Sequence, residues 1–179
     1  MDRILKAHFD KFMREGKLPP ELCEGKNAES CANLKLFDNE NLLSVWRNNF
    51  KGISWTDKKG NILHGAVDNI LVNKTNNKLI VLDYKTRGFP VKENTAENYQ
   101  LQLDVYNFLL KKNGYKTEDF AFLLFYVPRE VTATGEVIFD TELKKVNISA
   151  ERGEKIWKNA LKLLNSECPK ETCEWCDRI

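Results

Sequence analysis

Two aspartates and a lysine form the most reactive combination of side chains in this sequence. Asp83 and Lys85 lie two residues apart at the end of the apolar run KLIVLDYKT, and Asp68 lies in a second largely apolar run, residues 62–73. Charged groups in buried strands are unfavourable unless other charges compensate them. Two neighbouring carboxylates can hold a hard divalent cation such as Mg2+, and an adjacent ammonium can assist a water molecule that attacks a phosphate. The combination therefore predicts metal-assisted phosphodiester hydrolysis.

These side chains meet only if the two apolar runs pair in one particular register. We expect an antiparallel hairpin whose turn is centred between Thr75 and Asn76, which places Asp68 directly opposite Asp83. Their Cβ atoms would then lie about 4.5 to 5.5 Å apart. Side chains alternate between the faces of a strand, so Lys85 joins the face of Asp83. The apolar neighbours on both faces indicate strands that are covered on both sides.

The other elements follow from hydrophobic periodicity and from turn residues. Helices are expected over residues 2–15, 38–50, 97–112 and about 150–164, and further strands over residues 53–55, 120–128 and 136–146. Residues 19–33, which contain glycine and proline breaks, are expected to form a loop. We expect one domain over residues 1–179, with an N-terminal helix and a cysteine-bearing C-terminal tail.

The composition is typical of a globular protein, with 42% apolar, 30% charged and 11% aromatic residues. Lys and Arg outnumber Asp and Glu by 28 to 26, and a net charge of +2 does not by itself indicate a nucleic-acid partner. The charged first residues lack the apolar core of a secretory signal, and no run reaches the roughly 18 apolar residues of a membrane helix. We therefore expect a cytoplasmic protein with no membrane contact.

The order of the motifs resembles the PD-(D/E)XK nuclease superfamily, specifically its RecB-like branch. The resemblance depends on GAVD at residues 65–68, on VLDYK at residues 81–85, and on Gln102 and Tyr106, which lie one helical turn apart. It covers roughly residues 45–176 and implies an α/β fold with a restriction-endonuclease-like core, in which helices flank a mixed central β-sheet. CRISPR-associated RecB-like exonucleases and AddB-type nuclease domains are similar proteins. The implied activity is that of a Mg2+- or Mn2+-dependent deoxyribonuclease, an exonuclease or DNA-end-processing enzyme, with a helicase, recombination or CRISPR-type complex as a partner.

The resemblance assigns catalytic roles to five residues: Asp68, Asp83, Lys85, Gln102 and Tyr106. The two aspartates and the backbone carbonyl of Tyr84 would bind the metal ion, and the lysine would assist the nucleophilic water. The glutamine and the tyrosine would position DNA and the lysine; alternatively, they belong to the polar outer stripe of an amphipathic helix. Nearby basic residues could contact DNA phosphates, although such charges are also typical of a solvated surface: Arg87, Lys92, Lys111 and Lys112.

The histidines depart from the family pattern. RecB-like nucleases often take a metal-binding histidine from a helix well upstream of the first aspartate. His8 lies on the expected N-terminal helix, whereas His64 lies only four residues before Asp68. Four residues of strand span roughly 13 Å, so His64 reaches the same ion only if the strand is bulged. Both histidines are candidate ligands.

The cysteines form a second departure. Some RecB-like nucleases hold a 4Fe-4S cluster with one N-terminal cysteine and three C-terminal ones, and this chain offers Cys23 or Cys31 with Cys168, Cys173 and Cys176. Four thiolates also suit tetrahedral Zn2+. The spacing of the last three reverses the usual order, and free thiols are the alternative.

Two other classes of function are open. One is a catalytically silent nucleic-acid-binding or structural module of the same fold, and the other is a small zinc-binding interaction protein. The intact set of Asp68, Asp83 and Lys85 argues against the first, because such a group is costly to keep in a core.

Overall fold

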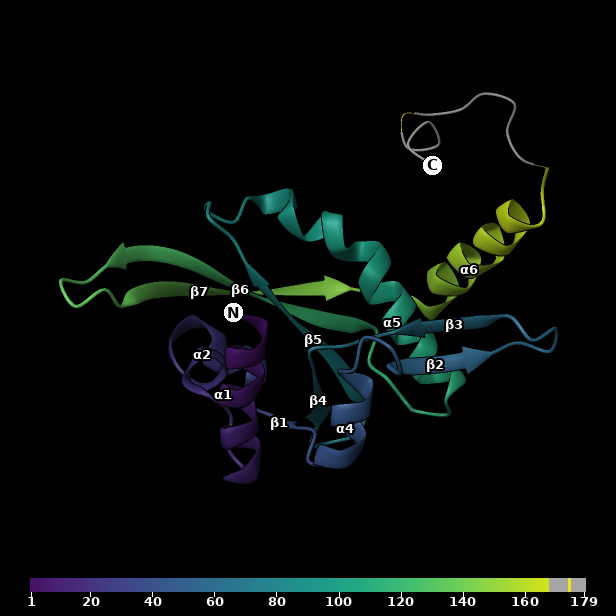
Figure 1. Ribbon diagram of the computed structural model, residues 1–179. Helices are drawn as coiled ribbons and strands as arrows, with labels where there is room; N and C mark the ends of the chain where they lie inside the picture. Colours follow the sequence, from purple (N-terminus) through teal and green to yellow (C-terminus); the bar gives the residue numbers. More distant parts are fainter. Residues whose placement is uncertain (168–173, 175–179) are drawn as a thin grey trace.

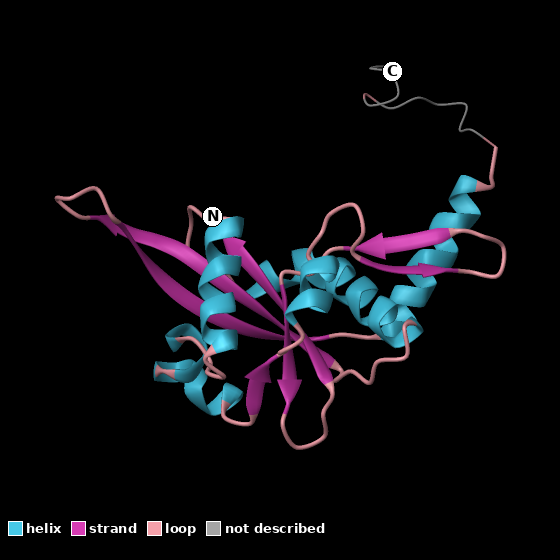
Figure 2. Cartoon of the chain, turned by 60° about the horizontal axis from the view of Figure 1, so that its bottom comes forward, coloured by secondary structure: helices cyan, strands magenta, loops and turns pink. Residues whose placement is uncertain are grey.

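The computed structural model describes residues 1–167 and residue 174. A five-stranded mixed sheet forms the centre, with the strand order β1-β4-β5-β6-β7, and β2 and β3 form a separate two-stranded sheet. Helices lie on both faces of the larger sheet (Figures 1 and 2). The expected α/β fold with a mixed sheet flanked by helices is confirmed. The strands are β1 Leu34–Leu36, β2 Ile53–Thr56, β3 Ile62–Gly65, β4 Asn69–Asn73, β5 Leu79–Thr86, β6 Phe120–Val131 and β7 Val137–Asn147.

The helices begin and end where caps and apolar spacing allow. They are α1 Asp2–Arg14, α2 Pro20–Cys23, η1 Gly25–Asn27, α3 Ala28–Cys31, α4 Glu40–Trp46, η2 Glu93–Tyr99, α5 Gln100–Lys112 and α6 Ala150–Leu164. In α1, Leu5, Phe9 and Met13 recur every four residues and are buried, so one stripe of the helix packs on the sheet. The Asn39 side chain caps α4, and Ser149 caps α6.

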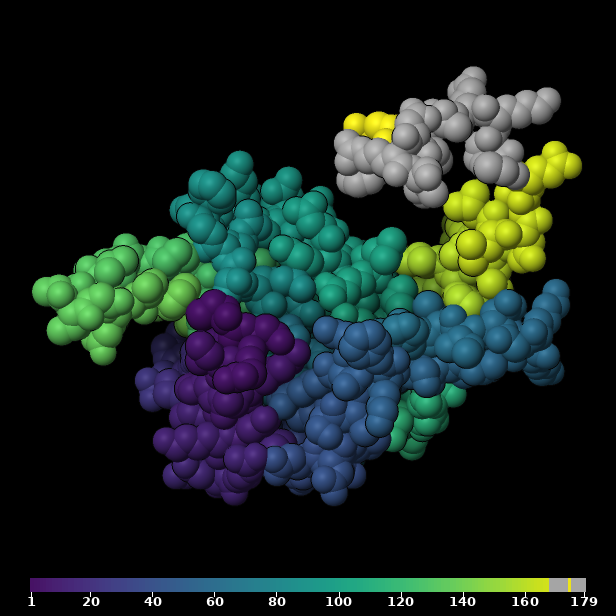
Figure 3. All heavy atoms as spheres, in the orientation of Figure 1, coloured from purple at the N-terminus to yellow at the C-terminus, as the bar shows by residue number. Residues whose placement is uncertain are grey.

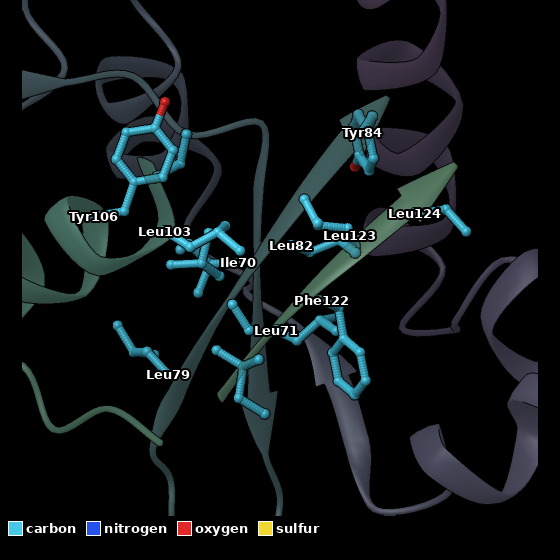
Figure 4. Packing of buried hydrophobic residues seen from close by; sticks show 14 of the residues in the cluster. Ile70, Leu71, Leu79, Leu82, Tyr84, Leu103, Tyr106, Phe122, Leu123 and Leu124 are labelled. Carbon is cyan, nitrogen blue, oxygen red and sulfur yellow. The ribbon is translucent and has the colours of Figure 1, made fainter. Parts of the chain in front are cut away.

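The central strand β5 is buried along six of its eight positions. It pairs with β4 in antiparallel fashion and with β6 in parallel fashion. Parallel neighbours need a crossover connection, which η2 and α5 provide. Figure 4 shows Tyr84 of β5 on the side of α1 and Tyr106 of α5 on the opposite side, so the two helices cover opposite faces of this strand.

The pairing of β4 with β5 has the expected register, because Asn69 lies opposite Leu82 and Ile70 lies opposite Val81. The single strand expected over residues 62–73 is wrong: it is interrupted at residues 66–68. The first part, β3, pairs with β2, and the second part, β4, enters the central sheet. Asp68 is therefore the residue directly before β4, where its carboxylate is not confined between strands.

Three further expectations need correction. Residues 19–33 do not form a plain loop, since they contain α2, η1 and α3. The helix expected over residues 97–112 starts as the 3-10 helix η2 at Glu93 and becomes α-helical at Gln100. The strand expected to end at Pro128 continues to Val131, and it stays paired with β7 through a register shift between Pro128 and Glu130.

Helix α6 fixes the position of α5. A Cβ atom on Gly153 would lie 2.5 Å from the carbonyl oxygen of Asp104, so the two helices are in contact because residue 153 has no side chain. The buried carboxylate of Asp104 accepts hydrogen bonds from Arg152 Nε at 2.7 Å and from Arg152 Nη2 at 2.9 Å. A bidentate charged pair of this kind restricts both helices.

The outer parts of β6 and β7 form an arm that projects from the body of the protein (Figures 1 and 3). Residues 128–137 of this arm are mostly exposed. Within the part of the chain that the structure describes, no helix has the length and apolar character needed to cross a membrane.

Candidate active site

The candidate site lies at the carboxyl end of β5. This strand and its parallel neighbour β6 end side by side, with Thr86 opposite Tyr126. In open α/β sheets, ligands commonly bind at the carboxyl ends of the strands. Asp83 is nearly fully buried there, with 2% of its surface exposed, so its charge is poorly solvated.

The segment of residues 66–68 brings Asp68 to the same end of β5. Its Oδ2 atom accepts a hydrogen bond of 2.9 Å from the backbone N–H of Tyr84. Its own backbone carbonyl accepts a hydrogen bond of 2.6 Å from Arg47 Nε. Arg47 Nη1 also bonds the Asp10 carboxylate at 2.6 Å. Asp68 is thus held from β5 on one side and from Arg47 on the other.

The ammonium of Lys85 has three neighbours of different kinds. It lies 2.5 Å from Asp83 Oδ2 in an ion pair, and it donates a hydrogen bond of 3.1 Å to Gln102 Oε1. The ring of Tyr99 lies with its centroid 4.6 Å from the same nitrogen, within the range of a cation–π contact. Lys85 therefore shares a face with Asp83, as expected, and its position is fixed on several sides.

Gln102 and Tyr106 connect Lys85 to the segment that carries Asp68. The amide nitrogen of Gln102 donates to the Tyr106 hydroxyl at 2.8 Å, and this hydroxyl donates to the Ala66 carbonyl at 2.6 Å. Burial raises the pKa of Tyr106 to about 12, so the hydroxyl keeps the proton that it donates. The two residues line the inside of the site, which contradicts a polar outer stripe.

Gly65 allows the Tyr106 ring to approach. A Cβ atom on residue 65 would lie 2.7 Å from Tyr106 Cε1, and a Cβ atom on Gly52 would lie 2.5 Å from the Gly65 carbonyl oxygen. Gly52 also has a positive φ of 57°, which favours glycine. The end of β3 before Asp68 is therefore packed against the Tyr106 ring on one side and against the backbone of Gly52 on the other.

Burial raises the pKa of Asp83 to about 6. The nearby charge of Asp68 raises it further, and the charges of Lys85 and Lys6 oppose the rise. Apart from its ion pair with Lys85, Asp83 Oδ2 has no hydrogen-bond partner among the described residues. A buried carboxylate oxygen whose one partner among the described residues is an ammonium, beside a second carboxylate, suits a bound cation.

A hard divalent ion fits these donors. Asp68 and Asp83 would hold it through carboxylate oxygens, with the Tyr84 carbonyl as the further predicted ligand. Among the described residues, no group of three or more His, Cys, Asp or Glu side chains could hold a metal ion. The two carboxylates alone suit Mg2+ better than Zn2+, since Mg2+ keeps several waters and binds through one or two carboxylates.

The structure does not bring either histidine to the two aspartates. His64 lies opposite Ser54 in the two-stranded sheet, and its side chain is exposed. The Nε2 atom of His8 lies 3.0 Å from the Glu21 carboxylate. His64 thus belongs to the smaller sheet and His8 pairs with Glu21, and a histidine ligand to the ion stays a prediction.

The cysteine prediction lies partly outside the described residues. Cys23 is exposed, Cys31 is buried, and both are free thiols. Burial raises the pKa of Cys31 to about 11, so it is neutral in the absence of a metal. Cys168, Cys173 and Cys176 are not among the residues that the structure describes, and a cluster or zinc site stays a prediction.

The basic residues expected to contact DNA fall into two groups. Arg87 directly follows β5, and Lys92 directly precedes η2, so both are close in sequence to the elements that carry the site. Lys111 and Lys112 lie in the last turn of α5. Nine residues of helix span about 13 Å, so Lys111 lies roughly that far along the axis from Gln102.

Three residues that contact the site were not expected from the sequence: Lys6, Arg47 and Tyr99. Lys6 Nζ lies 3.2 Å from Asp68 Oδ1. The helical spacing of four residues between Lys6 and Asp10 is a signal that both side chains leave α1 on one side. For Tyr99, the signal is its position three residues before Gln102, one helical turn away.

This fold and this pair of carboxylates beside a lysine define a class of metal-dependent phosphodiester hydrolases. A family model of the PD-(D/E)XK nuclease superfamily matches residues 4–178, and the chain belongs to this superfamily. Nucleases of this superfamily act on DNA and typically use divalent metal ions such as Mg2+. No curated protein matches the chain.

Proposed function

We propose that this protein is a Mg2+- or Mn2+-dependent deoxyribonuclease of the RecB-like branch, acting as an exonuclease or on DNA ends. The observation that carries the proposal is the convergence of Asp68, Asp83 and Lys85 at the carboxyl end of β5, where Lys85 Nζ lies 2.5 Å from Asp83 Oδ2. Asp83 is 2% exposed. A buried acid with so few hydrogen-bond donors destabilises the fold. Such groups are typical of functional sites.

The chain's own residues would then divide the work. Asp68, Asp83 and the Tyr84 carbonyl hold the divalent ion, which when bound polarises the phosphate and lowers the pKa of its water. Lys85 orients the attacking water and stabilises the charge that develops on the phosphate. Gln102, whose Oε1 accepts from Lys85 at 3.1 Å, keeps the ammonium in place. Tyr106 holds the segment that carries Asp68.

DNA would enter across the carboxyl end of β5. Arg87 and Lys92 would contact its phosphates beside the site, with Gln102 and Tyr106 inside it and Lys111 farther along α5. Such contacts position a strand without reading its bases. We expect a helicase, recombination or CRISPR-type complex to supply the substrate.

The test is cleavage of an end-labelled linear duplex and of covalently closed plasmid in Mg2+ or Mn2+. We expect the linear duplex to be degraded, the closed plasmid to remain intact, and EDTA to stop the reaction. Asp83→Ala should lower the rate roughly a hundredfold or more, because it removes both a metal ligand and the partner of Lys85. Asp38→Ala is the matched control, since Asp38 is an exposed acid that pairs with Lys35.

The outcomes separate the candidate functions. Cleavage of the closed plasmid, which has no ends, would show that the protein is an endonuclease and not an end-directed enzyme. If neither the wild type nor Asp83→Ala cleaves DNA, and both still bind it, the protein is the catalytically silent module instead.

A further inference from the structure

Lys6 of α1 lies at the edge of the candidate metal site. Its ammonium is 3.2 Å from Asp68 Oδ1 and 2.9 Å from Asp2 Oδ1. Only 19% of the Lys6 side chain and 18% of the Asp68 side chain are exposed. This ion pair is therefore partly buried, unlike the exposed pairs that contribute little.

The position of Lys6 is fixed by the packing of α1. Phe9 is fully buried and its ring lies 4.6 Å, centroid to centroid, from the ring of Tyr84. One turn after Lys6, Asp10 bonds Arg47, which also bonds the Asp68 carbonyl. Figure 3 shows α1 and the α4 region side by side on the surface. The helix thus presents Lys6 to Asp68 from a defined place.

The two carboxylate oxygens of Asp68 have different partners. Its Oδ2 atom accepts the backbone N–H of Tyr84, and its Oδ1 atom lies against the Lys6 ammonium. A divalent ion on Oδ1 would lie close to the Lys6 ammonium. Two cations at such a distance repel each other strongly where solvent is partly excluded.

Each carboxylate of the site therefore has its own ammonium, Lys85 on Asp83 and Lys6 on Asp68. The contact of Lys85 belongs to the catalytic group already described. We propose that Lys6 is the counter-cation that holds Asp68 before the divalent ion binds, and that the ion must displace it. This inference rests on the proposed function. It makes Lys6 a positioning residue that sets the affinity of the site for metal.

The displaced ammonium keeps a partner. Asp2 lies one helical turn before Lys6 and accepts a hydrogen bond from it at 3.1 Å. Lys6 can therefore leave Asp68 without losing all charge compensation, which keeps the displacement reversible.

The experiment is a calorimetric titration of the full chain with MnCl2 in the absence of DNA. Lys6→Gln should bind Mn2+ roughly tenfold more tightly than the wild type, because a competing positive charge is gone. Lys6→Arg should bind like the wild type. The control is Lys11→Gln, which makes the same charge change at an exposed position of the same helix and should stay within about twofold of the wild type. Asp68→Asn should abolish tight binding.

A second measurement covers the case in which Lys6→Gln is poorly folded. The rise of the unfolding temperature with added MnCl2 should be larger for Lys6→Gln than for Lys11→Gln, because ligand stabilisation grows with affinity. If both measurements give equal values for the two variants, the inference about Lys6 is overturned, while Mn2+ binding that depends on Asp68 keeps the proposed function. If no variant binds Mn2+, both are overturned.

Discussion

The ammonium of Lys85 is restrained by three chemically different partners. A carboxylate, an amide oxygen and an aromatic face surround it, contributed by Asp83, Gln102 and Tyr99. A cation over an aromatic face gains about 0.5 to 2 kcal/mol. Tyr99 ends η2 directly before α5, so its backbone is restrained at the junction of the two helices. The side chain that is proposed to orient the water thus has little freedom of its own.

We expect Tyr99→Leu to lower the maximal cleavage rate roughly tenfold, because Lys85 gains rotamer freedom when the aromatic face is absent. Tyr99→Phe should cleave at nearly the wild-type rate, since it keeps the ring. Single-turnover cleavage at saturating Mg2+ measures the difference. Equal rates for the leucine and phenylalanine variants would remove Tyr99 from the group that positions Lys85.

At the scale of elements, the break between β3 and β4 builds the site. Gly65 ends β3, and after three intervening residues the chain joins the central sheet at Asn69. The Tyr106 ring fills the space where a side chain of residue 65 would lie. This places the Tyr106 hydroxyl on the Ala66 carbonyl. The contact between α5 and the break thus determines where Asp68 emerges.

Gly65→Ala should therefore destabilise the protein by about 1 to 3 kcal/mol, the usual cost of overpacking. The cleavage rate of the folded variant should also fall, because displacement of the Tyr106 ring moves the hydroxyl that accepts a hydrogen bond from Gln102. Urea denaturation gives the free energy of unfolding. Gly88→Ala is the matched control, since a Cβ atom there meets no atom within 4 Å. Equal stabilities of the two variants would contradict this role of Gly65.

Much of the central hairpin is readable from the sequence. The apolar runs and the turn near Thr75 and Asn76 predict the register that the structure has, with Asn69 opposite Leu82. The break at residues 66–68 is not predicted, because apolar residues continue through it and only tertiary contacts of Gly65 reveal it. The short helices near Pro20 are also missed, since a single turn carries no periodic signal.

The candidate site can be predicted from the sequence only in part. Spacing alone brings Asp83 and Lys85 to one face of a strand. The contact of Lys6 with Asp68 depends on how α1 docks, and the many charges of that helix are equally typical of a solvated surface. The metal ligands and catalytic roles stay predictions until they are tested.

For the whole molecule, the buried Asp83 links stability to pH and to metal. Its folded pKa of about 6 lies above the ordinary value of 3.8, so between these pH values the folded protein holds a proton that the unfolded chain has lost. This contribution to stability is fully present below about pH 4 and is lost as the pH rises through about 6. Ionised Asp83 then weakens the metal-free fold.

In EDTA, we expect Asp83 to make the wild type lose up to about 1.4 kcal/mol of stability per pH unit between roughly pH 4 and 6. Asp83→Asn should lack this contribution, so the difference in stability between the two proteins should change with pH over that window. Mn2+ should stabilise the wild type at pH 7.5 and have little effect on the variant. Urea denaturation at a series of pH values measures both. A difference that does not vary with pH would show that Asp83 ionises normally.

The Tyr106 hydroxyl accepts from Gln102, which holds Lys85, and donates to Ala66, two residues before Asp68. A single oxygen atom therefore fixes the geometry of the lysine and of the aspartate together. An engineer who moved Asp68 to favour a different ion would shift Lys85 as well. The positions of Asp68 and Lys85 can be changed independently only if Tyr106 is first replaced by two separate hydrogen-bonding groups, one for each residue.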